Sequence, residues 1–172
     1  MSESHRTLVP YRPEWRQKFE AEKEKLKVVF GTEALEIEHI GSTSIEGMPS
    51  KPIVDIAVLI ESCKDAERFN DDLEKIGYIS YMPGNERNFF IKGDPIKFHL
   101  SIAYTDRGGF WERQILFRDY LRDNPEARDE YAELKRKLLE NDPSGVGEYI
   151  RGKEAFVLKI LRKAGWKGDR VA

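Results

Sequence analysis

Cysteine is nearly absent from this sequence, which contains only Cys63 among its 172 residues. A single cysteine excludes an internal disulfide and is typical of a reducing compartment. Cys63 follows Glu61 and Ser62 and has no histidine nearby in the sequence, whereas a thiol nucleophile needs an activating base. We therefore expect no thiol chemistry from this protein.

Long apolar runs and an excess of one charge are also missing. No stretch approaches the roughly 20 apolar residues of a membrane span, and the N-terminus lacks the apolar core of a secretion signal. The formal net charge is -2 with 35% charged residues, which gives no reason to expect general affinity for nucleic acids or membranes. Basic residues gather near the C-terminus, where either a solvated helix end or a local basic patch would explain them. We expect a cytoplasmic protein.

The periodicity of the apolar residues predicts an α+β protein with one domain over residues 1–172. Helical spacing recurs over 15–30, 63–76, 110–124, 125–140 and 149–164, and strand patterns occupy 35–40, 53–60, 78–81, 87–92 and 96–104. This order predicts an α/β core over 1–106, with a mixed sheet of four or five strands and flanking helices. Residues 107–172 should form a helical part packed on that core.

Asp55 interrupts a strand that is otherwise apolar. The run over 53–60 has the composition of a strand covered on both faces. A carboxylate buried in such a strand without a partner costs several kcal/mol. We therefore expect Asp55 to meet a cation, a hydrogen-bond donor or an open cleft. A structural aspartate that caps the adjacent loop is the alternative.

The segments around Asp55 resemble the GrpB family. The resemblance rests on His-Ile-Gly-Ser-Thr-Ser at 39–44, Gly-Met-Pro at 47–49 and Lys-Pro-Ile-Val-Asp-Ile at 51–56. Later blocks of the family follow in order at Arg87, 89–90, His99, 117–122, Tyr149 and Lys153. The resemblance covers nearly the whole chain, and it implies a nucleotidyltransferase-like fold.

The resemblance also implies a phosphate site beside Asp55. In nucleotidyltransferases of this superfamily, a Gly-Ser turn holds nucleotide phosphates, and two acids on the next strand bind metals that neutralise the developing charge. Here Gly41 and Ser42 precede Asp55, but the second acid is replaced by Ala57. One carboxylate can still suffice for Mg²⁺ when phosphates supply further ligands. If a metal binds, we therefore expect Asp55 as its ligand and Mg²⁺ as the ion.

Two other acids could replace the missing carboxylate. Glu38 should point to the opposite face of its strand from His39, and Glu46 lies in a loop. The catalytic candidates are Asp55, His39 and His99. The histidines could serve as general base, phosphate donor or metal ligand. A satisfied core position is the alternative for each histidine.

The phosphate-binding candidates are small, hydroxyl-bearing or cationic residues in the matched blocks. They are Gly41, Ser42, Thr43, Ser44, Lys51, Arg87, Arg118, Tyr149 and Lys153. Solvated loop positions or exposed ion pairs are the alternatives for the charged ones. The helical spacing of Trp111, Phe117 and Tyr131 assigns these aromatic residues to the core.

Three functions remain open from the sequence. The first is transfer of a nucleotidyl group from a nucleoside triphosphate to a small molecule or protein. The second is a binding module for a nucleotide, a CoA-like molecule or another phosphorylated ligand, since GrpB-like domains also occur fused to dephospho-CoA kinase. The third is a phosphoryl or hydrolytic reaction that uses the two histidines. The expected partner is therefore a small phosphorylated ligand rather than nucleic acid or a membrane.

Overall fold

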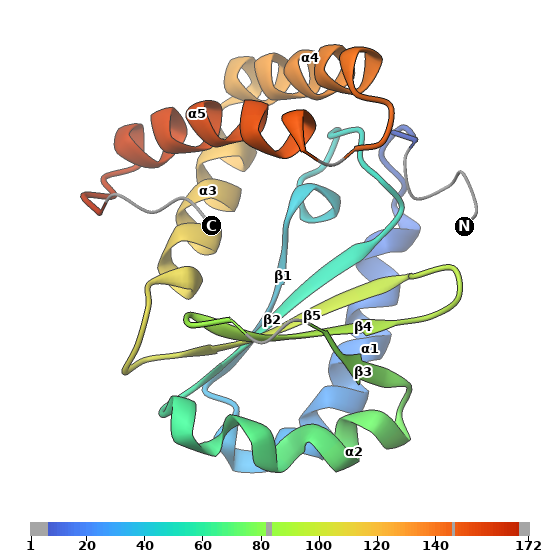
Figure 1. Cartoon of the computed structure of the whole chain (residues 1–172), viewed down its shortest axis with the longest axis vertical. Coiled ribbons are helices and arrows are strands. Elements are labelled where there is room, and N and C mark those ends of the chain that lie inside the picture. The colour runs from blue at the N-terminus through green and yellow to red at the C-terminus, as the bar shows by residue number, and fades with distance from the viewer. Residues whose placement is uncertain (1–6, 82–83, 146, 169–172) are drawn as a thin grey trace.

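Five strands form one mixed sheet in the order β1-β2-β5-β4-β3 (Figure 1). The computed structural model describes residues 7–81, 84–145 and 147–168. The central neighbours β2 and β5 are parallel, and the other neighbouring pairs are antiparallel. The predicted α+β class and mixed sheet are confirmed. The strands are β1 (Glu36–Ile40), β2 (Val54–Ile60), β3 (Tyr78–Ser80), β4 (Arg87–Lys92) and β5 (Phe98–Tyr104).

The helices follow the predicted segments with one difference. The segment expected as one helix over 63–76 consists of a 3-10 segment, η4 (Cys63–Phe69), followed by the short α2 (Asn70–Lys75). The other helices are α1 (Glu14–Phe30), α3 (Phe110–Asp123), α4 (Pro125–Asn141) and α5 (Glu148–Lys163), with 3-10 segments η2 (Gly31–Glu33) and η3 (Ser42–Ser44). Within the described ranges, none of the helices has the length and apolar character to span a bilayer.

One face of the sheet packs on α1 and α2. Side chains alternate along a strand, so Ile56 and Val58 of β2 point to this face and join Phe19 and Leu26 of α1 in the main core. Ile37 of β1 belongs to the same core. The alternation predicted for the first strand is thus present, with Ile37 directed to the face covered by α1.

The other face carries Asp55 and lies on the side of α3, α4 and α5 (Figure 1). Asp55 is paired in register with Ile40 of β1 and His99 of β5, so these three side chains share a face. Next to them, Ala57 and Leu59 pack with Trp111 of α3. These three helices therefore cover the sheet face that carries Asp55, opposite the face that packs into the main core.

The loop that follows η3 packs against α3, α4 and α5. Ile45 and Met48 are fully buried and pack in one cluster with Leu121 of α3, Tyr131 of α4 and Ile160 of α5. Burying side chains of this size stabilises the fold by about 1.5–3 kcal/mol each. This cluster fixes the loop between β1 and β2, and with it the glycine-serine turn, against the three C-terminal helices.

Candidate functional site

The turn over residues 41–44 lies directly against Asp55. Gly41 has φ 71° and ψ -175°, a combination that is essentially restricted to glycine. A Cβ atom at this position would overlap the Oδ2 atom of Asp55. Ser44 closes the turn, because its Oγ donates to the Gly41 carbonyl at 2.5 Å and its N–H donates to the same oxygen at 3.1 Å. Glycine is therefore required here for backbone and carboxylate to meet.

Asp55 is paired with His99 across the two parallel strands. Oδ1 of Asp55 lies 3.0 Å from Nδ1 of His99, and both side chains are half-buried. The next residue on the same face of β2 is Ala57, which is fully buried. On β5, the corresponding Ser101 accepts a hydrogen bond from Arg87 Nη1 at 2.7 Å. The row beside Asp55 thus has an apolar and a hydroxyl side chain where acids would be needed for a second metal.

Three lysines gather on the other side of the turn residue Ser42. Lys135 of α4 donates to Ser42 Oγ at 2.9 Å and to the Pro49 carbonyl at 2.7 Å. Lys51 and Lys153 both lie over the ring of the buried Tyr149, with Nζ 4.8 and 4.4 Å from its centroid. Three segments, the loop between β1 and β2, α4 and α5, therefore place three ammonium groups around one hydroxyl and one aromatic ring.

The surroundings of these lysines disfavour their charged forms. Burial, together with repulsion from Lys153 and Lys51, lowers the pKa of Lys135 to about 7. Burial also lowers the pKa of Lys153 to about 8, with Lys51 adding to the shift and Asp55 opposing it. The pKa of Lys51 is lowered by burial and raised by Asp142. A bound anion would relieve this repulsion, so the cluster is suited to a phosphate.

These groups line a cleft with two lobes, which we call the Asp55 cleft. The lysine lobe has a volume of about 220 Å³ and the helical lobe about 270 Å³. Both lobes share Ser42, Asp55 and Lys153. The lysine lobe also has Ser50, Lys51, His99, Lys135 and Tyr149; the helical lobe has Gly41, Arg113, Gln114, Phe117, Tyr131, Ile150, Glu154 and Val157.

The donor atoms of the Asp55 cleft suit one Mg²⁺ ion at most. In the described parts of the chain, no cluster of three or more histidine, cysteine, aspartate or glutamate side chains could hold a metal. Asp55 offers one carboxylate, and its immediate polar neighbour is His99. Such a set fits an ion that enters with phosphate oxygens, and it does not fit a two-metal site. Glu38 and Glu46, considered above as replacements, line a different cavity.

Several predicted site residues lie together in the Asp55 cleft. They are Gly41, Ser42, Lys51, Asp55, His99, Tyr149 and Lys153. Arg87 lies near them, on the same face of the sheet. Its guanidinium stacks over Phe89 and Phe110, 4.4 and 4.7 Å from the ring centroids. The same group donates a hydrogen bond to Ser101 Oγ.

The structure places the remaining predicted residues away from Asp55. His39 is directed to the α1 face, where its ring stacks on Phe19 at 5.0 Å and its Nε2 lies 2.9 Å from Thr43 Oγ1. Burial lowers the pKa of His39 to about 4, so the ring is neutral at pH 7. Arg118 donates to Glu38 Oε2 at 3.1 Å and to the His39 carbonyl at 3.0 Å. Ser44 belongs to the same side as His39 and Thr43.

Lys135 was missed by the sequence reasoning, although a signal existed. It lies at the position between Tyr131 and Leu138 on the apolar side of α4, and it is buried. A lysine in an apolar stripe indicates a buried charge with a partner. Phe117 and Tyr131 were assigned to the core, and they do pack there, but they also line the helical lobe. Spacing along a helix cannot distinguish core from cavity wall.

Comparisons with known proteins find a matching family model and similar sequences. A family model described as GrpB protein matches residues 6–163. The chain is 37% identical over 169 residues to the protein YqkA of Bacillus subtilis, which covers 95% of this chain and 48% of that protein. It is 36% identical over 163 residues to the glutamate-rich protein GrpB of Alkalihalophilus pseudofirmus, which covers 91% of this chain and 94% of that protein.

Solved structures support the fold. The crystal structure of GrpB from Enterococcus faecalis matches with a TM-score of 0.84 and 32% identity, over 92% of this chain and 96% of that one. The Cid1 poly(U) polymerase with Mg 3'-dATP bound matches with a TM-score of 0.57 and 14% identity, over 84% of this chain and 49% of that one. The second likeness concerns the fold alone, and it confirms the predicted nucleotidyltransferase-like architecture.

A further relative is longer than this chain. The dephospho-CoA kinase of Mycolicibacterium paratuberculosis is 28% identical over 194 residues, which covers 93% of this chain and 48% of that protein. The chain therefore spans about half the length of this relative and of YqkA.

Proposed function

The chain belongs to the GrpB family, and from this premise we propose that its Asp55 cleft binds the phosphates of a nucleotide or of a CoA-like molecule. The gathering of Lys51, Lys135 and Lys153 in one cleft with Ser42 carries this proposal. The cleft is lined by three lysines and by two carboxylates, Asp55 and Glu154, so positive charge is in excess when the lysines are protonated. Phosphate is the common biological anion that satisfies several ammonium groups at once.

The two lobes divide a phosphorylated ligand into its charged and its organic parts. Phosphates fit the lysine lobe, where ammonium and hydroxyl groups converge. The helical lobe offers the aromatic walls of Phe117 and Tyr131 together with the amide of Gln114. An apolar wall with a few polar groups suits a heterocycle or an acyl-type chain. CoA-like ligands are included because a relative of this chain is named dephospho-CoA kinase.

Calorimetry with ATP, GTP and CoA, each with and without Mg²⁺, tests this proposal. We expect at least one of these ligands to bind, and Lys153→Met to weaken its binding about tenfold because an ammonium contact in a desolvated site is lost. Lys163→Met is the matched control, since Lys163 is exposed on the same helix, and it should bind like wild type. If Mg²⁺ strengthens binding, Asp55→Ala should remove that increment. Absence of binding by all three ligands, or equal binding by Lys153→Met, would contradict the proposal.

A second candidate is nucleotidyl transfer, which the position of Asp55 favours. The carboxylate lies at the start of β2 against the Gly-Ser turn, in the arrangement that nucleotidyltransferases use for their first acid. In this reaction an acceptor oxygen or nitrogen attacks the α-phosphorus of a nucleoside triphosphate, the bond to the β-phosphate oxygen breaks, and pyrophosphate leaves. The acceptor's proton needs a base, and His99 beside Asp55 is suitably placed.

Pyrophosphate release separates the two candidates. The protein is incubated with nucleoside triphosphates, Mg²⁺ and a metabolite mixture, and pyrophosphate is measured. Release by wild type that vanishes in Asp55→Asn would establish transfer. Nucleotide binding without release would leave the cleft as a binding site.

A further inference from the structure

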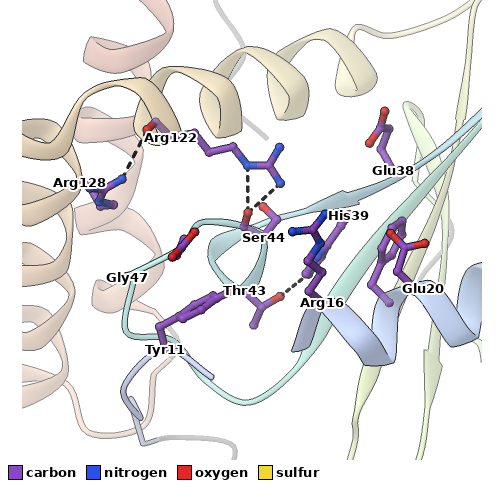
Figure 2. A pocket seen from close by; sticks show the side chains of 12 residues that line it. Tyr11, Arg16, Glu20, Glu38, His39, Thr43, Ser44, Gly47, Arg122 and Arg128 are labelled. Atoms are coloured by element: carbon purple, nitrogen blue, oxygen red, sulfur yellow. Dashed lines mark hydrogen bonds between the residues drawn. The ribbon is translucent and has the colours of Figure 1, made fainter. Parts of the chain in front are cut away.

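A second and larger cavity, of about 770 Å³, lies beside η3 and shares no lining residue with the Asp55 cleft (Figure 2). Its walls come from α1, the end of β1, the 41–44 turn, α3 and α4. Its volume is within the range of about 300–1,000 Å³ that is typical of small-molecule sites. We call it the arginine cavity, after Arg16, Arg122 and Arg128 in its lining.

The three arginines of this cavity have no carboxylate partners within the described residues. Arg122 uses Nε and Nη2 to bind one carbonyl, that of Ser44, at 3.0 and 2.8 Å. Arg128 reaches only the carbonyls of Leu121 and Arg122, at 3.5 and 3.4 Å. Burial and repulsion from Arg118 lower the pKa of Arg122, and attraction to Asp119 and Glu38 opposes this shift. The end of the cavity formed by α3 and α4 therefore presents two guanidinium groups, and the exposed Glu46 also lines the cavity.

An unpaired acid faces the same cavity from α1. Arg16 and Glu20 are four residues apart on this helix, a spacing at which opposite charges usually pair. No ion pair joins them in the part of the chain that the structure describes, and both side chains line the cavity. Figure 2 shows Arg122 and Arg128 on one side of His39 and Glu20 on the other. Glu38 lies nearby but is already bound by Arg118.

Uncharged side chains line the cavity between Arg122 and Glu20, and Figure 2 shows Arg16 of α1 in front of His39. His39 is stacked on Phe19 and is held near Thr43, and Tyr11 lines the same region (Figure 2). Because the His39 ring is neutral, this wall offers planar surface and hydrogen bonds without charge. A molecule lying across it would meet the guanidinium groups of Arg122 and Arg128 at one end. At the other end it would meet the carboxylate of Glu20, with the guanidinium group of Arg16 on the same helix.

We propose that the arginine cavity binds a zwitterionic molecule of the size of a dipeptide. Its carboxylate lies at Arg122 and Arg128, its ammonium group lies at Glu20, and its middle lies on the wall formed by His39 and Tyr11. Ligand charges of both signs replace the ion pairs that the cavity residues do not make with one another. Binding here requires no ligand in the Asp55 cleft, with which the cavity shares no lining residue.

Calorimetry with the dipeptide Ala-Phe, its N-acetylated form and its C-terminal amide tests the proposal. We expect the free dipeptide to bind, and each blocked form to bind about tenfold more weakly because one charge pair is lost. Glu20→Gln should weaken the free dipeptide to the same extent and make it equal to the acetylated form. Arg128→Gln should also weaken binding of the free dipeptide about tenfold, so that its affinity equals that of the C-terminal amide. Lys18→Gln, an exposed change on α1 outside the cavity, should have no effect.

Three results would overturn this assignment. The first is no binding of the free dipeptide at concentrations up to about 10 mM. The second is binding that neither blocking group nor Glu20→Gln changes. The third is displacement of the dipeptide by ATP, which would assign the site to phosphates instead. A wild-type circular dichroism spectrum for each variant ensures that the comparison concerns binding and not folding.

Discussion

Replacing Gly41 with alanine is expected to abolish ligand binding in the Asp55 cleft and to lower the free energy of unfolding by about 3 kcal/mol. The backbone at Gly41 has φ 71° and ψ -175°, which costs an alanine about 1–3 kcal/mol. The added Cβ would also overlap the Asp55 carboxylate. Relief requires the carboxylate to leave its place between the turn and His99, so the phosphate site loses its geometry. Chemical denaturation and calorimetry measure the two effects.

Gly31→Ala provides the matched control for this experiment. Gly31 also has positive φ, 57°, but a Cβ atom there would meet no heavy atom within 4 Å. Its replacement should cost about 1–3 kcal/mol for the backbone alone, with ligand binding unchanged. If Gly41→Ala retained wild-type ligand affinity, the contact between turn and carboxylate would be unimportant for the site.

Lys135→Met is expected to weaken binding of a phosphorylated ligand about 100-fold while it stabilises the protein at pH 6. Lys135 is the most deeply buried of the three lysines, so its ammonium contact with a phosphate is the least screened. The methionine would fill a similar volume without a charge. It would forgo the bonds to Ser42 and Pro49, which offset part of the gain. A net stabilisation of about 2 kcal/mol follows from these opposing contributions.

The pH dependence of stability gives a second readout of Lys135. Its pKa is lowered from 10.5 to about 7 in the folded protein. Between these values the unfolded chain binds more protons than the folded one, so the free energy of unfolding should rise with pH, by about 1.4 kcal/mol per pH unit. The penalty is fully present below pH 7. Lys135→Met should flatten this rise, whereas Lys137→Met, at an exposed position of α4, should preserve it.

Ligand affinity should change with pH in the opposite direction. The free protein loses protons from Lys135 and Lys153 as the pH passes about 7 and about 8. A phosphate binds the protonated lysines, so binding should take up protons and weaken from pH 6 to pH 9. Calorimetry in buffers of different ionisation enthalpy measures this uptake. Affinity that is constant over this range would contradict the role of the two lysines.

The elements of the fold could be predicted because each one has a local pattern. Apolar spacing located α1, α3, α4 and α5 within one or two residues, and glycine and proline marked most of their ends. Asp55 was identified because a single acid in an apolar strand needs a partner. Its partner, His99, was also a candidate, although the sequence alone could not show that the two strands are parallel neighbours.

The division of the candidates between two cavities could not be predicted, because it depends on register. Alternation placed His39 and Ile40 on opposite faces of the first strand, but the sequence does not say which face carries Asp55. The pairing of Ile40 with Asp55, and of His39 with Ile56, decides this. A shift of one residue would have brought His39 to Asp55. Lys135 joins the site only through the packing of α4, which is a tertiary property.

The 41–44 turn separates the Asp55 cleft from the arginine cavity and contributes residues to both. On one side, Ser42 receives a bond from Lys135 of α4, and on the other, the Ser44 carbonyl receives two from Arg122 of α3. Hydrogen bonds thus hold the turn to both α3 and α4, and its Gly41 lies against Asp55. A ligand that shifts the turn from either cavity changes the volume of the other cavity and the distances between its charged groups. Thermodynamic linkage makes such an influence mutual and equal in size. A shift of the turn would therefore couple the ligand affinities of the two cavities without any domain motion.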